Sequence, residues 1–159
     1  MDKELKNLIG KERRITKQLL LYWNKLRDES PMPDFKELNP DIMGDVWKDC
    51  FVVKVSGSGK HATFDMVYRG ENVLNLFQEV SPKGMNYIQE CLDLFFEQVI
   101  RTKRPAIEEA EFIPTDETEL RFRMVILPLS ESSERIDMIV GGIRGQILPC
   151  AFEDFDFGE

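Results

Sequence analysis

The chain has 159 residues, a length that suits one domain of ordinary size. With 42% hydrophobic and 31% charged residues, it can bury a core and is not disordered as a whole. Its net charge of −8, from 29 acidic and 21 basic side chains, disfavours nucleic acid as a partner, because phosphate binding depends on Lys and Arg.

The sequence gives no sign of a membrane, a disulfide or a metal. No apolar run approaches the ~20 residues that cross a bilayer, and the N-terminus lacks the apolar core of a signal peptide, so we expect a cytoplasmic protein with no membrane span. Cys50, Cys91 and Cys150 form no CxxC pair, which disfavours a disulfide framework and a zinc site. His61 is the single histidine, and we interpret it as an ordinary residue at the start of a strand.

The first predicted element is a helix from Lys3 to Glu29. Its apolar residues fall on one side at 3.6-residue spacing: Leu8, Ile15, Leu19, Tyr22, Trp23 and Leu26. Leu21 falls on the opposite side and leaves room for a partner helix, although one exposed leucine is also normal. We therefore hypothesise a homodimer through this helix, with Leu19, Leu21, Tyr22 and Trp23 as candidate contacts. Ser30-Pro-Met-Pro33 ends the helix.

A short helix and a β-hairpin are predicted next. Asn39 as N-cap and Pro40 at the first helical position begin a helix that runs to about Trp47. Strands over Asp49 to Ser56 and His61 to Arg69 flank a glycine-rich turn. Apolar and mostly polar residues alternate along the second strand, which is typical of an antiparallel sheet covered on one side.

Helices and three further strands complete the predicted order. The helices cover Glu71 to Phe77 and Met85 to Arg101, the second with a continuous apolar stripe. The strands cover 106–113, 119–129 and 135–143, with loops at 114–118 and 130–134. This order predicts an α+β domain with a five-stranded antiparallel sheet and helices on one face, plus the N-terminal helix.

The sequence carries no catalytic motif. Gly57-Ser-Gly-Lys-His61 is not a phosphate loop, because Lys54 stands where that motif needs glycine and His61 where it needs Ser or Thr. One histidine cannot complete a Ser/His/Asp or Cys/His constellation. We therefore do not expect an enzyme.

An ordered set of short motifs resembles the PAS domain family, and more narrowly the short bacterial proteins that consist of one PAS domain preceded by a helix. The motifs are Leu21–Arg27, Pro31–Pro33, Asn39–Pro40, Phe64–Gly70, Ile126–Ser130 and Asp137–Gly142, within roughly Leu19 to Arg144. The resemblance implies a signal-transduction or sensory module. It divides the chain into an N-terminal helix (1–30), a PAS domain (31–145) and a C-terminal tail (146–159).

The resemblance also implies a cavity between the sheet and the crossover helices. Candidate ligand-pocket residues are Phe64, Met66, Tyr68, Arg69, Phe77, Phe95, Met124 and Ile126, with Tyr68 and Arg69 as polar contacts at the rim. Aromatic and Met residues at such spacing also suit a plain core. The residues identify no cofactor: the Asn-Cys-Arg stretch of flavin photosensors is missing, and His61 is not in the crossover helices where haem-binding PAS domains place their ligand.

The predicted tail places Phe152, Phe155 and Phe157 among acidic residues. These phenylalanines either dock on a partner or fold back over the sheet. We expect a cytosolic signalling module that acts as an adaptor or regulator through protein–protein interaction or dimerisation. The alternative is a sensor that binds a small molecule in the cavity.

Overall fold

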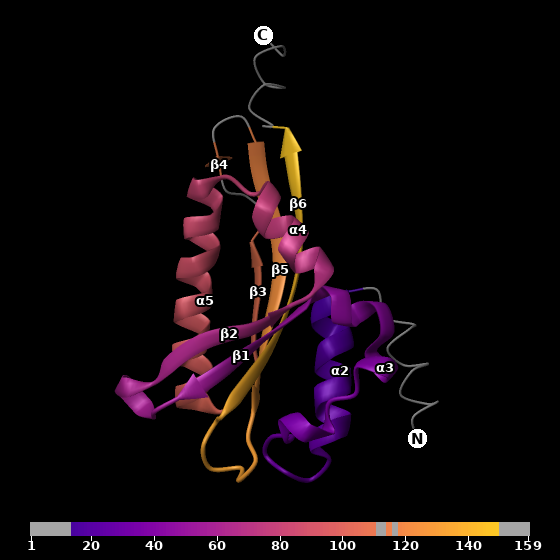
Figure 1. Cartoon of the computed structure of the whole chain (residues 1–159), viewed down its shortest axis with the longest axis vertical. Coiled ribbons are helices and arrows are strands. Elements are labelled where there is room, and N and C mark those ends of the chain that lie inside the picture. Colours follow the sequence, from indigo (N-terminus) through magenta and orange to yellow (C-terminus); the bar gives the residue numbers. More distant parts are fainter. Residues whose placement is uncertain (1–13, 111–113, 116–117, 150–159) are drawn as a thin grey trace.

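The computed structural model describes residues 14–110, 114–115 and 118–149. Four helices of the described ranges surround a strongly twisted sheet (Figure 1). The helices are α2 (Ile15–Arg27), the short α3 (Pro40–Met43), α4 (Glu71–Glu79) and α5 (Pro82–Thr102), and the strands are β1 (Cys50–Ser56), β2 (Thr63–Arg69), β3 (Ala106–Ala110), β4 (Pro114–Thr115), β5 (Thr118–Leu129) and β6 (Met138–Pro149). Short 3₁₀ helices occupy Phe35–Glu37, Gly44–Asp49 and Gly59–His61.

The sheet is antiparallel throughout, with the strand order β2-β1-β6-β5-β3. This confirms the predicted five-stranded α+β architecture. Strand β4 adds a two-residue pairing with β5, in a segment that we predicted to be a loop. The β5–β6 ladder is the longest and runs from the pair Thr118–Pro149 to the pair Leu129–Met138.

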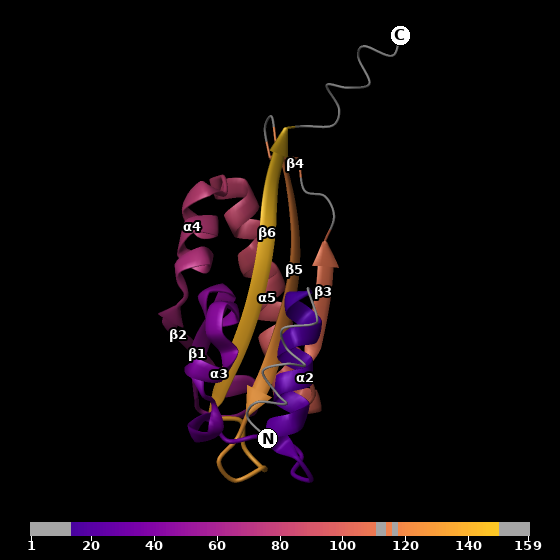
Figure 2. The same cartoon turned by 90° about the vertical axis from the view of Figure 1, so that its right-hand side faces the viewer.

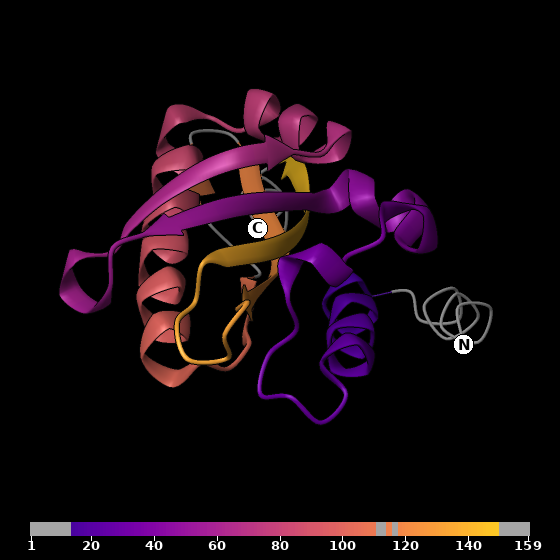
Figure 3. The same cartoon turned by 60° about the horizontal axis from the view of Figure 1, so that its bottom comes forward.

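Helices cover both faces of the central strands. A Cβ atom added to Gly142 would meet Leu19 of α2, whereas one added to Gly145 would meet Leu76 of α4. Because residues three apart on a strand point to opposite faces, α2 and α4 lie on opposite sides of β6, as Figure 2 shows. In Figure 3, β6 likewise runs between α5 and α2.

This arrangement adds the position of the N-terminal helix to the predicted architecture. Burial alternates along β2, as expected for a sheet covered on one side. In the centre, however, the consecutive residues Val125, Ile126 and Leu127 of β5 are all buried, because α2 packs on one face and α4 with α5 on the other. The N-terminal helix thus supplies the second cover that the alternation of β2 could not reveal.

Helix α2 belongs to the core of the domain. Ile15 and Leu19 are buried against the sheet, and the indole Nε1 of Trp23 donates a hydrogen bond to the carbonyl of Pro128 at 2.8 Å. The hydroxyl of Tyr22 accepts a hydrogen bond from the backbone N–H of Asn39 at 2.7 Å. The described part of the predicted N-terminal unit is therefore continuous with the domain, while its first 13 residues lie outside the described ranges.

Local capping explains where two helices begin. The Asn39 side chain accepts from the N–H of Asp41 at 3.0 Å, and Pro40 occupies the first turn of α3, as predicted. Ser81 accepts from the N–H of Gly84 at 3.1 Å, with Pro82 in the first turn, so α5 begins three residues before the predicted start.

The last strand differs from its prediction at both ends. Strand β6 begins at Met138 instead of Arg135, because Ser130 Oγ and the Asp137 carboxylate hold the preceding residues in a hydrogen-bonded loop. It continues to Pro149, so the first four residues of the predicted tail belong to the sheet. Residues 150–159, with the three tail phenylalanines, lie outside the described ranges.

Candidate functional site

The space between the sheet and α5 is filled by side chains at its centre. Met124 and Ile126 of β5 are completely buried. The Phe64 ring of β2 lies 5.1 Å, centroid to centroid, from the ring of Phe96 in α5, and Phe96 is itself buried. Three of the implied pocket residues, Phe64, Met124 and Ile126, therefore take part in core packing.

The other implied pocket residues lie around the margin of the core. Met66, Phe77 and Phe95 are partly buried. Tyr68 stacks on Trp47 with a centroid distance of 4.7 Å and an interplanar angle of 13°. Burial raises the pKa of the Tyr68 hydroxyl.

Tyr68 and Arg69 do not share a pocket rim. Successive residues of a strand point to opposite faces, so their side chains diverge. Tyr68 is partly buried against Trp47, whereas Arg69 is exposed. The eight residues are thus divided among core, margin and surface.

A pocket of about 780 Å³ opens beside the turn between β1 and β2, and we call it the end pocket. Apolar side chains contribute Ala62, Phe64, Ile100 and Ile136 to its lining. Charged side chains contribute Lys60, Glu97, Arg101, Lys103, Glu134 and Arg135. Of the eight implied pocket residues, Phe64 alone lines this pocket.

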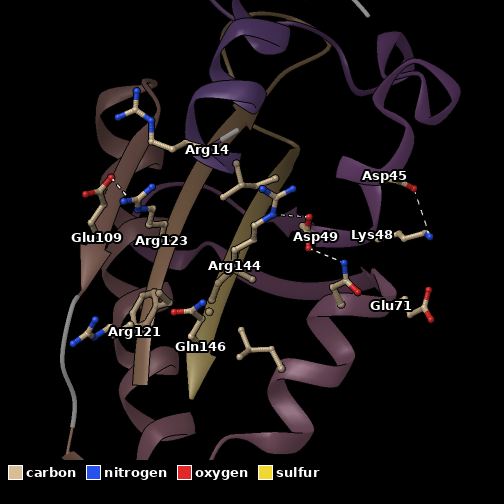
Figure 4. A pocket seen from close by; sticks show the side chains of 16 residues that line it. Arg14, Asp45, Lys48, Asp49, Glu71, Glu109, Arg121, Arg123, Arg144 and Gln146 are labelled. Atoms are coloured by element: carbon tan, nitrogen blue, oxygen red, sulfur yellow. Dashed lines mark hydrogen bonds and ion pairs between the residues drawn. The ribbon is translucent and has the colours of Figure 1, made fainter. Parts of the chain in front are cut away.

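A larger depression of about 1090 Å³ lies where α2 begins, on the face of the sheet that this helix covers (Figure 4). Its lining includes four arginines, Arg14, Arg121, Arg123 and Arg144, and we call it the arginine groove. The strand register explains this concentration, because Arg123 pairs with Arg144 and Arg121 pairs with Gln146 across β5 and β6. Cross-strand partners share a face of the sheet.

The deepest ion pair of the arginine groove involves Asp49. This carboxylate is buried, and it accepts hydrogen bonds from Arg144 Nε and from Asn72 Nδ2, each at 2.9 Å. The pair connects the 3₁₀ turn before β1 to the last strand and to α4. Asp49 thereby holds Arg144 in position.

Looser ion pairs surround this contact. Arg123 lies 3.6 Å from Glu109 of β3, and Arg121 lies 3.4 Å from Glu119. Lys48 lies 3.5 Å from Asp45 on the far rim. These distances exceed the 2.7–2.9 Å of a tight charged hydrogen bond, so these ion pairs hold Arg121 and Arg123 only weakly.

Sequence reasoning did not single out the arginine groove. Its one local sign is the alternation Arg121-Phe-Arg123, which places two cations on one face of a strand. The contributions of Arg14 and Arg144 depend on strand register and on the packing of α2, neither of which the sequence alone specifies.

The candidate dimer contacts of the first helix differ in their exposure to solvent. Leu19, Tyr22 and Trp23 are buried within the chain, so their side chains are not available to a partner. Leu21 is 37% exposed.

Among residues 14–110, 114–115 and 118–149, no group of three His, Cys, Asp or Glu side chains is placed to hold a metal ion. His61 is exposed in a 3₁₀ turn just before β2. Burial raises the pKa of the Cys50 thiol. Burial also raises the pKa of the Cys91 thiol. Over the same described ranges, no helix has both the length and the apolar character of a membrane span.

Comparison with known proteins identifies the family through one family model. A family model described as a PAS domain matches residues 11–144. Among solved structures, the PAS domain of Bordetella pertussis BvgS is similar, with 11% sequence identity and a TM-score of 0.38, and the match covers 70% of this chain and 90% of that chain. The search of curated proteins found no match.

Proposed function

Because this chain belongs to the PAS domain family, a family of sensory and signalling modules, we propose that it is a cytoplasmic adaptor or regulator that acts through protein–protein interaction. The observation that carries this proposal is the filled centre of the domain. Met124 and Ile126 are completely buried, and the Phe64 and Phe96 rings are in contact where a ligand would otherwise lie. A domain packed in this way can serve as a scaffold without a bound small molecule.

Native mass spectrometry of the gently purified full chain tests the proposal. We expect the mass of the polypeptide, or of a simple multiple of it, with no added small molecule. A mass excess that disappears on denaturation would contradict the proposal and favour a ligand-binding sensor.

The homodimer hypothesis now depends on Leu21 alone among the first-helix candidates. Leu21→Glu should shift a dimer to monomer in analytical ultracentrifugation without loss of folding, because the side chain is exposed in the protomer. Leu74→Glu, at another exposed apolar position, on α4, is the matched control. An unchanged dimer in the Leu21 variant would exclude this surface.

The end pocket favours a second candidate function, a small-molecule sensor. Phe64, Ile100 and Ile136 offer an apolar surface, and basic side chains outnumber acidic ones around it. This combination suits a ligand with an apolar body and an anionic group.

Thermal unfolding distinguishes the two functions. A panel of aromatic and aliphatic carboxylates should raise the melting temperature if one of them binds the folded state. Phe64→Ala should remove that increase, whereas Phe95→Ala, which does not line the end pocket, should lower the starting melting temperature but preserve the increase. If no carboxylate stabilises the protein, this chemical class is excluded for the end pocket.

A further inference from the structure

The arginines of strand β5 retain hydrogen-bonding capacity beyond their present contacts. The side chains of Arg121 and Arg123 are 53% and 48% exposed, and they form loose ion pairs of 3.4 Å and 3.6 Å with Glu119 and Glu109. A guanidinium carries five N–H donors, so one such contact leaves most of them available. The Arg123–Glu109 pair is exposed on both sides, so it is weak and a better-placed carboxylate can replace it.

Five basic and four acidic side chains line the arginine groove, whereas the chain as a whole has a net charge of −8. Three acidic side chains in the lining already contact cations: Asp49 with Arg144, Glu109 with Arg123, and Asp45 with Lys48. In Figure 4, Arg14, Arg121, Arg123 and Arg144 occupy the part of the groove over β5 and β6, while Asp45 and Glu71 lie at its other side. The four arginines are thus gathered in one part of the groove, while Lys48 lies with Asp45 at the other side.

The last strand leads out of this part of the groove. Gln146 lines it, and β6 ends three residues later at Pro149. The ten residues that follow contain Glu153, Asp154, Asp156 and Glu159, and no Lys or Arg. These four carboxylates account for half of the net charge of the chain.

The following segment is long enough to return to the groove. From Pro149 back to Arg144 the distance along β6 is about 17 Å, at roughly 3.3 Å per residue. Ten extended residues span up to ~33 Å, which covers a reversal of direction and the return path.

We propose that the arginine groove binds an acidic, phenylalanine-containing polypeptide segment, and that its occupant is residues 150–159 of the same chain. The carboxylates of Asp154 and Asp156 would pair with guanidinium groups, and the ring of Phe152, on the same side of an extended segment, would lie on an arginine plane. In an extended segment, Asp154 and Asp156 are two residues apart and share one side, which matches the spacing of Arg121 and Arg123. The covalent connection favours this occupant, because a short flexible link gives a local concentration on the order of mM.

This interaction goes beyond the proposed adaptor function and does not depend on it. A docked segment would cover the groove against an acidic segment of another protein. Failure of the adaptor proposal, seen as a retained ligand, would leave the groove and its occupant unaffected.

Paramagnetic relaxation in the full-length chain tests the proposal. A nitroxide is attached at Gly158→Cys in a Cys150→Ser background, and the burial of Cys50 and Cys91 protects these thiols from the reagent. We expect strong loss of intensity for the backbone amide signals of Arg121, Arg123 and Arg144. The loss should weaken in ~1 M salt, where the screening length is about 3 Å.

Matched charge variants control this experiment. Arg121→Glu/Arg123→Glu should abolish the intensity loss around the groove, whereas Lys25→Glu/Lys36→Glu, which makes the same change of charge at exposed positions away from the groove, should preserve it. Asp154→Asn/Asp156→Asn leaves every groove residue intact and should also abolish it.

Three results would overturn the proposal. The first is the absence of intensity loss at the groove, and the second is a loss centred on the end pocket. The third concerns a mixture of spin-labelled unenriched chains with ¹⁵N-labelled chains that carry no nitroxide: if the groove signals are lost to the same extent there, the occupant comes from a second copy instead of the same chain.

Discussion

The buried carboxylate of Asp49 accepts a hydrogen bond from Arg144 Nε at 2.9 Å, which ties the entry of the first strand to the last strand. The second oxygen of the carboxylate accepts from Asn72 of α4, also at 2.9 Å. One acidic side chain thus connects three segments that are far apart in the sequence. The hydrogen bond from Arg144 to Asp49 also fixes where the Arg144 side chain lies within the arginine groove.

Asp49→Ala should lower the free energy of unfolding by about 2–3 kcal/mol, because two hydrogen bonds to a charged acceptor are lost. Arg144→Ala should cost less, about 1–2 kcal/mol, since its side chain is 43% exposed and solvent screens the pair. Urea unfolding of both single variants and the double variant gives the coupling free energy, which we expect to be about 1 kcal/mol. Coupling near zero would mean that the pair does not stabilise the fold.

Gly141→Ala should destabilise the domain by about 1–3 kcal/mol, because the added methyl group overpacks the core. Gly141 is the cross-strand partner of Phe51, and a Cβ there would lie 2.1 Å from the Phe51 ring. Gly145→Ala is the control, since the nearest atom to its Cβ would be a methyl carbon at the end of the Leu76 side chain, at 3.0 Å. Chemical unfolding should show the larger loss at Gly141, and a smaller loss there would contradict the packing described.

The double variant Gly141→Ala/Phe51→Leu should recover part of the loss caused by Gly141→Ala. A leucine leaves room where the aromatic ring now covers the glycine. If the two substitutions are simply additive, the ring is not the source of the steric conflict.

Trp23→Phe should reduce the free energy of unfolding by about 1–3 kcal/mol, because the buried Pro128 carbonyl loses its indole donor.

Deletion of residues 1–28 should unfold the domain, since α2 covers one face of the sheet. Circular dichroism and near-ultraviolet spectra report both outcomes. A folded, cooperative truncated protein would show that the sheet does not need α2 as its cover.

Alkaline pH should destabilise the protein through its buried thiols. The pKa of Cys50 is raised above its ordinary value of 9.0 by burial, so the folded state retains a proton that the unfolded state releases. This stabilisation is complete below pH 9 and is lost as the pH rises further, by up to ~1.4 kcal/mol per pH unit for each thiol. Urea midpoints between pH 7 and pH 10 measure the slope.

Cys50→Ala provides the control for the pH dependence. It should lower stability at pH 7, because a buried side chain is shortened, yet its stability should fall less steeply above pH 9. The remaining slope should reflect Cys91, whose pKa burial also raises. Equal slopes in the parent and the variant would exclude ionisation of Cys50 as a cause.

Local patterns predicted the elements and the family, because helix stripes, the Asn39–Pro40 start and the alternation in β2 are properties of neighbouring residues. They did not predict which faces of the sheet are covered, since that depends on where α2 packs after the chain has folded. The fully apolar run Val125–Leu127 in β5 is compatible with burial on both faces. The elements that pack on each face must be known, however, before burial on both faces can be concluded.

The candidate sites were less accessible from sequence. Aromatic and Met side chains such as Phe64 and Met124 suit a core or a cavity equally, and only packing distinguishes the two. The arginine groove joins residues from α2 and two strands through the register of Arg123 with Arg144. Side chains more than twenty positions apart carry no local periodicity that could connect them.

Gly141 and Gly142 are adjacent on β6, yet the first lies under the Phe51 ring and the second under Leu19 of α2. At this point only the backbone of β6 separates the Phe51 ring of β1 from Leu19 of α2. A sideways displacement of β6 therefore changes the packing of the Phe51 ring and the packing of α2 together, because neither glycine has a side chain that could adjust. Two residues without side chains make this strand the place where a movement on one face of the sheet is transmitted directly to the other.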